Sequence, residues 1–175
     1  MSDDLRFPIG RFERVAEVSV ADAAPLLDQI ASLPDELRAA LAGLSDAQLA
    51  TPYRPEGWSV SQVVHHLADS HMNAFIRCKL LLTEEQPTVK PYLQDAWAAT
   101  ADNTVDVQTS VALLEGLHRR WVALLRPATG ADLQRTYIHP EHGRPVPLGN
   151  TIALYAWHGR HHVAHITELR RREGW

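Results

Sequence analysis

Histidines are concentrated near the C-terminal end of this chain, at a spacing that could bind a metal ion. The segment WHGRHHVAHI, residues 157–166, contains His158, His161, His162 and His165. Histidine is the commonest metal ligand, and residues at i, i+3, i+4 and i+7 share one side of a helix. Two overlapping HxxxH pairs result, and either pair could bind one divalent ion from successive turns. The spacing leaves open which pair does so.

A second group of histidines lies in the middle of the chain. The segment HHLADSH contains His65, His66 and His71. Helix bundles build metal sites from side chains on facing helices, so two helices could direct histidines at one point. Three neutral imidazoles would leave one coordination position of zinc open, as in catalytic zinc sites. An ion held in this way polarises an electrophile or lowers the pKa of a bound water or thiol.

Spacing within the C-terminal segment slightly favours one histidine pair as the inward-facing one. His158 and His162 continue a stripe that contains Tyr155, whereas His161 shares its side with Trp157 and lies nearer the rim. A small rotation of the helix would reverse this preference. The residues alone therefore leave both pairs open.

Four amphipathic helices would have to position these side chains. Hydrophobic periodicity predicts them at residues 22–44, 59–82, 107–126 and 150–172. Ser59 and Gln62 form a capping box before the second helix, and Asn150 is a suitable N-cap for the fourth. Pro34 should kink or break the first helix. We predict an all-α fold, a four-helix bundle that forms a single domain over residues 1–175.

The segments between these helices are long. We expect residues 1–20 to form an ordered or semi-ordered arm. Residues 83–105 should be a crossover connection anchored by Tyr92 and Trp97, and residues 128–148 contain a short hairpin or lid.

Composition excludes several classes of protein. The net charge is −4, from 17 basic and 21 acidic residues, and there is no basic stripe, so we expect no nucleic-acid partner. Cys78 is the only cysteine, which excludes an intramolecular disulfide, and its apolar helix indicates a structural role. No apolar run is long enough to span a bilayer and the first residues do not resemble a signal peptide, so we expect a cytoplasmic protein without a membrane partner.

A polar stripe runs along the second predicted helix through Gln62, His66, Asp69, Asn73 and Arg77. It either faces solvent or lines a polar cavity, and the pattern favours neither. Asp69 is a candidate acceptor for a ligand ring or a proton, with an exposed position as the alternative. Arg77 could pair with a substrate carboxylate, although a surface arginine is the commoner case.

Further histidines are candidates for acid–base chemistry. His161, His165 and His71 could act as general bases or line a cleft, and ordinary core or surface roles compete with this interpretation. Trp157 and Trp121 are expected in the core.

Long segments of the chain resemble the YfiT-type metal-dependent hydrolases of the DinB-like superfamily. They are FPIGRF, TPYRPEGWSVSQVVHHLADSHMNAFIRCKLLLTEE, LHRRWVALLR, YIHP and YAWHGRHHVAHITELRRREGW. The resemblance implies that His66, His158 and His162 hold the metal, with one zinc per subunit and nickel as an alternative. It also implies a cytoplasmic homodimer. His139 falls where the family shows HP, and His142 has no counterpart, so the roles of both stay open.

The resemblance implies a metal-dependent hydrolase that acts on a small-molecule substrate, with a metal-activated water or low-molecular-weight thiol as nucleophile. One alternative is a thiol S-transferase, similar to bacillithiol transferases, that joins a cellular thiol to electrophiles. An alternative of another class is a metal-binding stress-response bundle without turnover.

Overall fold

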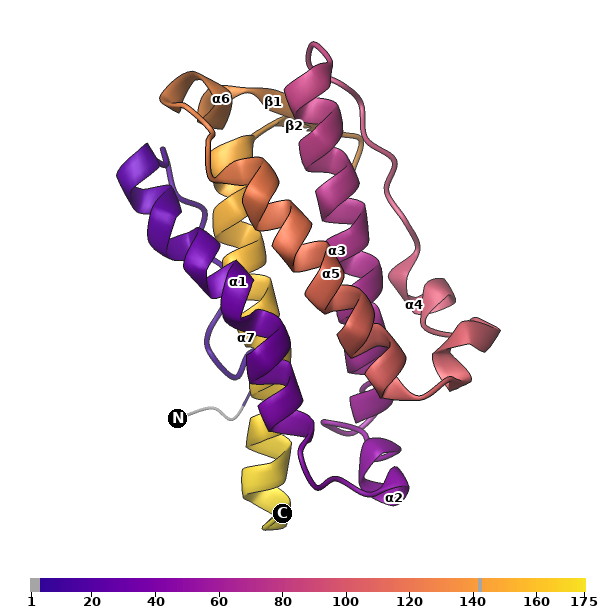
Figure 1. The fold of residues 1–175 in the computed structure, drawn as a ribbon. Coiled ribbons are helices and arrows are strands. Elements are labelled where there is room, and N and C mark those ends of the chain that lie inside the picture. Colours follow the sequence, from indigo (N-terminus) through magenta and orange to yellow (C-terminus); the bar gives the residue numbers. More distant parts are fainter. Residues whose placement is uncertain (1–3, 142) are drawn as a thin grey trace.

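A computed structural model describes residues 4–141 and 143–175 of the protein. Four long helices make up most of the fold (Figure 1). They are α1 (Val20–Leu41), α3 (Val60–Thr83), α5 (Val107–Leu125) and α7 (Leu148–Glu173). Helices α1 and α3 each pack against both α5 and α7, so the four enclose one interior. The predicted all-α four-helix bundle is confirmed. Within the two described ranges, no helix is both long and apolar enough to cross a bilayer.

Short elements occupy the connections. They are α2 (Asp46–Leu49), α4 (Gln94–Trp97), η1 (Ala101–Thr104), α6 (Gly130–Gln134), β1 (Thr136–His139) and β2 (Arg144–Pro147). The two strands pair antiparallel with Tyr137 opposite Val146, which confirms the predicted hairpin. The crossover containing α4 runs along the outside of α3 (Figure 1). In this crossover the ring centroids of Tyr92 and Trp97 lie 4.8 Å apart. His142 lies outside the described residues.

Local capping signals account for one predicted helix start and not for another. The Ser59 hydroxyl accepts from the Gln62 N–H and the Gln62 side chain accepts from the Ser59 N–H, so the predicted capping box is confirmed. The prediction of Asn150 as N-cap is wrong. Helix α7 begins at Leu148, directly after the hairpin, and Asn150 is buried inside its first turn. Pro147 occupies the cap with extended backbone, because strand β2 continues straight into the helix.

The sequence predicts that Pro34 kinks or breaks the first helix. Helix α1 is continuous through Pro34, so the predicted break is wrong, and the helix ends at Leu41 instead of Leu44. Proline has no N–H, which leaves the Ile30 carbonyl without its helical donor. Nδ1 of His118, on α5, lies 2.5 Å from that oxygen and donates to it. A neighbouring helix thus replaces the hydrogen bond that proline removes.

The interior contains two hydrophobic clusters with histidines between them. One cluster includes Trp121 and the other includes Leu67. Along α3, α5 and α7, the residues of the two clusters are separated by His71, His118 and His158 respectively. A polar layer therefore crosses the bundle where the metal site is expected.

Candidate metal centre

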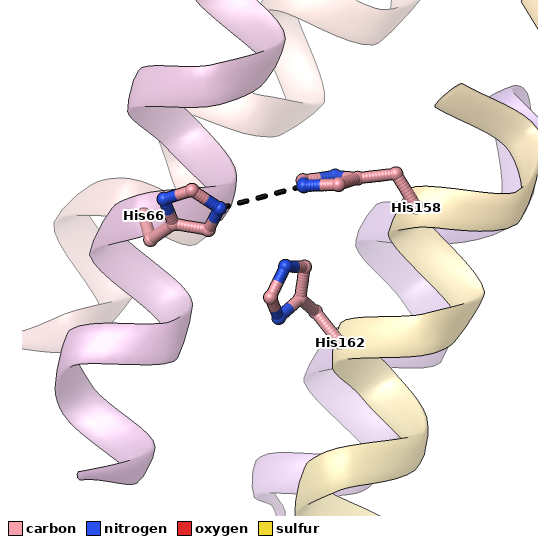
Figure 2. A group of neighbouring side chains, drawn as sticks. All are labelled: His66, His158 and His162. Atoms are coloured by element: carbon pink, nitrogen blue, oxygen red, sulfur yellow. Dashed lines mark hydrogen bonds between the residues drawn. The ribbon is translucent and has the colours of Figure 1, made fainter. Parts of the chain in front are cut away.

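Three histidines from two helices meet at one end of this polar layer. His66 comes from α3, and His158 and His162 come from α7 (Figure 2). One ring nitrogen of each lies within 4.8 Å of the others, and Nε2 of His66 is 3.4 Å from Nε2 of His158. Two nitrogens bound to a tetrahedral zinc ion at about 2.0–2.1 Å would also lie about 3.4 Å apart. The cluster therefore fits the group that the sequence predicted for it.

A chain of hydrogen bonds determines which nitrogen of His158 carries the proton. The Ile30 carbonyl can only accept, so His118 donates to it through Nδ1. Nε2 of His118 then accepts from Nδ1 of His71, 2.9 Å away, and Nε2 of His71 accepts from Nδ1 of His158, 3.1 Å away. His158 is left with an unprotonated Nε2 that faces His66, as a metal ligand requires.

A second chain acts in the same way on His162. Nε2 of His165 lies 3.1 Å from the Arg6 carbonyl and donates to it. Nδ1 of His165 is therefore an acceptor, and it lies 3.3 Å from Nδ1 of His162. His162 thus carries its proton on Nδ1 and keeps its Nε2 lone pair free.

Burial keeps these imidazoles neutral. Desolvation is the main cause that lowers the pKa to about 4 at His66, His118 and His165. Desolvation followed by the charges of neighbouring histidines lowers the pKa well below its ordinary value at His71, His158 and His162. Neutral rings are the form that binds a divalent ion, so protons compete little with a metal near neutral pH.

A cleft of about 690 Å³ opens onto the three histidines. Aromatic rings from the N-terminal arm and from the loop before α3 line it. Tyr53 stacks on His165 with ring centroids 4.0 Å apart, and Trp58 lies 4.6 Å from His66. Phe7 from the arm also lines the cleft. The predicted N-terminal arm and the loop before α3 therefore shape the site instead of only connecting elements.

His161 also lines this cleft, although the sequence placed it nearer the rim. It is buried and stacks on Trp157 at 4.4 Å. Its Nδ1 has no hydrogen-bond partner among the described residues, and burial lowers its pKa to about 4. The prediction of a core position is wrong for Trp157, which is half-buried at the cleft, and confirmed for Trp121.

Asp69 and His71 lie away from the cleft. Burial, and then the charge of Asp102, raises the pKa of the half-buried Asp69 carboxyl. In the described part of the chain, no hydrogen bond joins this carboxylate to a histidine, so its proposed role stays a prediction. His71 is fully buried behind His158, with both ring nitrogens in the hydrogen-bond chain.

The polar stripe of α3 is only partly exposed. His66 and Arg77 are buried and each lines a cavity, which supports the cavity interpretation for these two residues. The other three stripe residues, Gln62, Asp69 and Asn73, are half-buried.

Sequence reasoning missed several residues that support the site. His118 lacked any neighbouring motif, and Arg6 contributes only a backbone carbonyl. Tyr53 and Trp58 lie in the segment between α2 and α3, whose residue types suggested no site. The one usable signal was Pro34, because a proline inside a helix leaves a carbonyl that needs another donor.

Comparisons with known proteins agree in fold and family. The sequence pattern of the DinB superfamily matches residues 29–166. A protein of Bacillus mycoides (strain KBAB4), named "Putative metal-dependent hydrolase", is 49% identical over 98% of this chain and 99% of its own length. A protein of that name from Geobacillus thermodenitrificans (strain NG80-2) is 50% identical over 99% of this chain and 98% of its own length. The structure of YfiT from Bacillus subtilis matches with a TM-score of 0.96 and 46% identity, covering 98% of this chain and 99% of YfiT. YfiT is described as "a probable metal-dependent hydrolase with an unusual four-helix bundle topology".

Proposed function

This chain belongs to the DinB superfamily, and we propose that it is a metal-dependent hydrolase in which His66, His158 and His162 hold one zinc ion, with nickel as the alternative. The observation that carries the proposal is the set of three neutral imidazoles at chelating distance beside a cleft. Three protein ligands are typical of catalytic zinc, because they leave a position for water or substrate. When bound, the ion would lower the pKa of a nucleophile or polarise an electrophile. The names of the relatives support this activity.

The surrounding residues orient the ligands and move protons. His71 and His165 hold the rings of His158 and His162 with their Nε2 atoms unprotonated. His161 lines the cleft, and we assign it the transfer of a proton between nucleophile and leaving group.

Transfer of a low-molecular-weight thiol to an electrophile is the second candidate. A second cavity, of about 600 Å³, shares His158 with the first cleft. Hydrolysis needs room for one organic substrate and a water molecule. Two cavities that meet at one metal ligand also offer the room for two organic reactants that a thiol transfer needs.

Metal content tests the ligand set. The purified protein should contain one zinc or nickel ion per chain, and His158→Ala should lose it while its circular dichroism stays helical. His65→Ala is the matched control, because His65 is a buried histidine of α3 that bonds Ser110 and not a ligand. A His158→Ala protein with a full metal complement would overturn the assignment.

Turnover assays separate the activities. One reaction contains a cellular thiol and monobromobimane, and parallel reactions contain simple esters and amides. Metal-dependent cleavage of the esters or amides supports the hydrolase, whereas metal-dependent conjugation without cleavage replaces it with the transferase. A protein that binds its metal and catalyses neither reaction is a metal-binding bundle, and both enzyme proposals fall.

A further inference from the structure

The second cavity contains a buried arginine. Arg77, on α3, is 9% exposed and lines the cavity together with Tyr92, Tyr155 and His158. Its guanidinium donates one hydrogen bond, of 3.0 Å, to the Lys90 carbonyl of the crossover. Among the described residues, no carboxylate lies within 4.0 Å of it.

Such an arginine is costly unless an anion joins it. A buried charge loses its hydration, and the loss is recovered when the charge is paired and its donors are used. Guanidinium has five N–H donors in a planar fork that matches a carboxylate, and the one bond to Lys90 leaves most of them unused. Because Arg77 lines a cavity, a ligand can reach these donors.

Neutral hydroxyl donors surround the same space. Ser70, Tyr92 and Tyr155 line the cavity together with Arg77, and the Ser70 hydroxyl lies beside both phenols. Phenol and alcohol O–H groups are hydrogen-bond donors near neutral pH, so all three can donate to an oxyanion near Arg77.

Two carboxylates limit where an anion can bind. Asp95 and Glu141 also line the cavity, and both are exposed. Their charges repel an anion elsewhere in the cavity and leave the neighbourhood of Arg77 as the favourable position.

We propose that Arg77 binds the carboxylate of a small-molecule reactant whose reactive group lies at the histidine cluster. The reaction at the cluster rests on the function proposed above, whereas the carboxylate site rests on the cavity itself. The two cavities share Gln94, Asp95 and His158, so one ligand can extend from one to the other.

The helix sets the length of this ligand. His66 and Arg77 are eleven residues apart on α3, which corresponds to about 16 Å along the helix axis. Long side chains on a helix lean toward its N-terminus, so the arginine reaches back toward His66. The ligand therefore spans less than about 16 Å, which indicates a short carboxylic acid, such as an acylated amino acid or a thiol with a carboxylate.

Calorimetric titration of the purified, metal-containing protein tests the site with glutarate and its neutral diamide, glutaramide. We expect glutarate to bind at least about tenfold more tightly than glutaramide, because a charge-assisted pair replaces neutral contacts. Arg77→Gln should weaken glutarate binding by about tenfold or more, and Arg77→Lys should weaken it less. Lys79→Gln, an exposed cation on the same helix that lines neither cavity, is the matched control and should bind as the wild type.

Each remaining outcome overturns the inference. Unchanged glutarate binding by folded Arg77→Gln, or equal binding of the two probes, removes the carboxylate site. If Arg77→Gln does not fold, the comparison of glutarate with glutaramide on the wild-type protein decides, and equal affinities remove the site. Binding of inorganic phosphate but not glutarate through Arg77 also removes the carboxylate assignment.

The binding experiment is independent of turnover. A protein that binds glutarate through Arg77 but shows no hydrolysis or conjugation keeps this site and loses the proposed function. A protein that turns over carboxylated and neutral substrates equally well keeps the function and loses the site.

Discussion

Replacing His118 by leucine should weaken metal binding, although His118 touches none of the three candidate ligands. In the native protein, the hydrogen bond from His118 to the Ile30 carbonyl fixes which ring nitrogen of His118 carries the proton. Through the next two hydrogen bonds it also fixes the tautomers of His71 and His158. Without His118, Nδ1 of His71 loses its acceptor, and His71 is free to carry its proton on Nε2. It then donates to Nδ1 of His158, which moves the proton of His158 onto the nitrogen that should bind the ion.

The size of the effect follows from this change of tautomer. Loss of a partner behind a metal-bound histidine typically costs tenfold to a hundredfold in metal affinity. That range corresponds to about 1.4–2.8 kcal/mol of binding free energy. Stability changes separately, because the Ile30 carbonyl and the buried ring nitrogen of His71 both lose their partner, at about 1–3 kcal/mol each.

Competition with a chromophoric chelator measures the zinc dissociation constant of each variant. His65→Leu is the control, since His65 is also buried and its Nδ1 lies 2.8 Å from the Ser110 hydroxyl, outside the chain of hydrogen bonds to the ligands. His118→Leu should bind zinc ten to a hundred times more weakly than His65→Leu. A folded His118→Leu protein with the wild-type dissociation constant would refute the argument from tautomers, and an equal loss in His65→Leu would point to general loosening of the bundle.

Three further predictions concern pH, the cysteine and helix packing. Burial lowers the pKa of His118 from 6.5 to about 4. Between these pH values His118 is therefore protonated in the unfolded chain and neutral in the folded, metal-free protein. Stability should thus be complete above pH 6.5 and fall toward pH 4, by about 3 kcal/mol for this residue alone; urea unfolding of chelator-treated protein measures it, and a flat profile from pH 7 to 5 contradicts it. Cys78→Ala should keep metal content and turnover and lose about 1 kcal/mol of stability, because the thiol is 1% exposed and burial raises its pKa to about 12; inactivation by this change would reveal a chemical role. Gly159→Ala should lower the melting temperature, since its Cβ would lie 2.7 Å from a methyl carbon of Leu33, a clash of about 1–3 kcal/mol against about 1 kcal/mol of gained helix propensity. A higher melting temperature would show that α1 and α7 are less tightly packed there.

Local sequence patterns predicted a helix end correctly where the groups that cap it are close in sequence. The capping box of Ser59 and Gln62 needs only residues three apart, so it could be read directly. The prediction failed at Asn150 and Pro34, where the outcome depends on other elements. A strand runs into α7 and sets its first residue, and His118 from α5 supplies the donor that Pro34 lacks.

The cavities likewise depend on contacts between elements that a local sequence pattern does not contain. The stripe of α3 could be recognised as polar, but its environment depends on the crossover that lies over it. Arg77 is buried because that chain segment, with the Lys90 carbonyl, covers it. No periodicity in the sequence of α3 contains this information.

The sequence by itself determined four helices and two groups of histidines, because helical periodicity and capping act over a few residues. Its resemblance to a family also pointed to His66, His158 and His162. Only the tertiary structure decided which nitrogens face one another and which carry protons. The bonds that decide this join residues 88 apart, His118 and Ile30, and 159 apart, His165 and Arg6. Spacing along one helix cannot specify such partners, since they depend on how helices rotate and pack against each other.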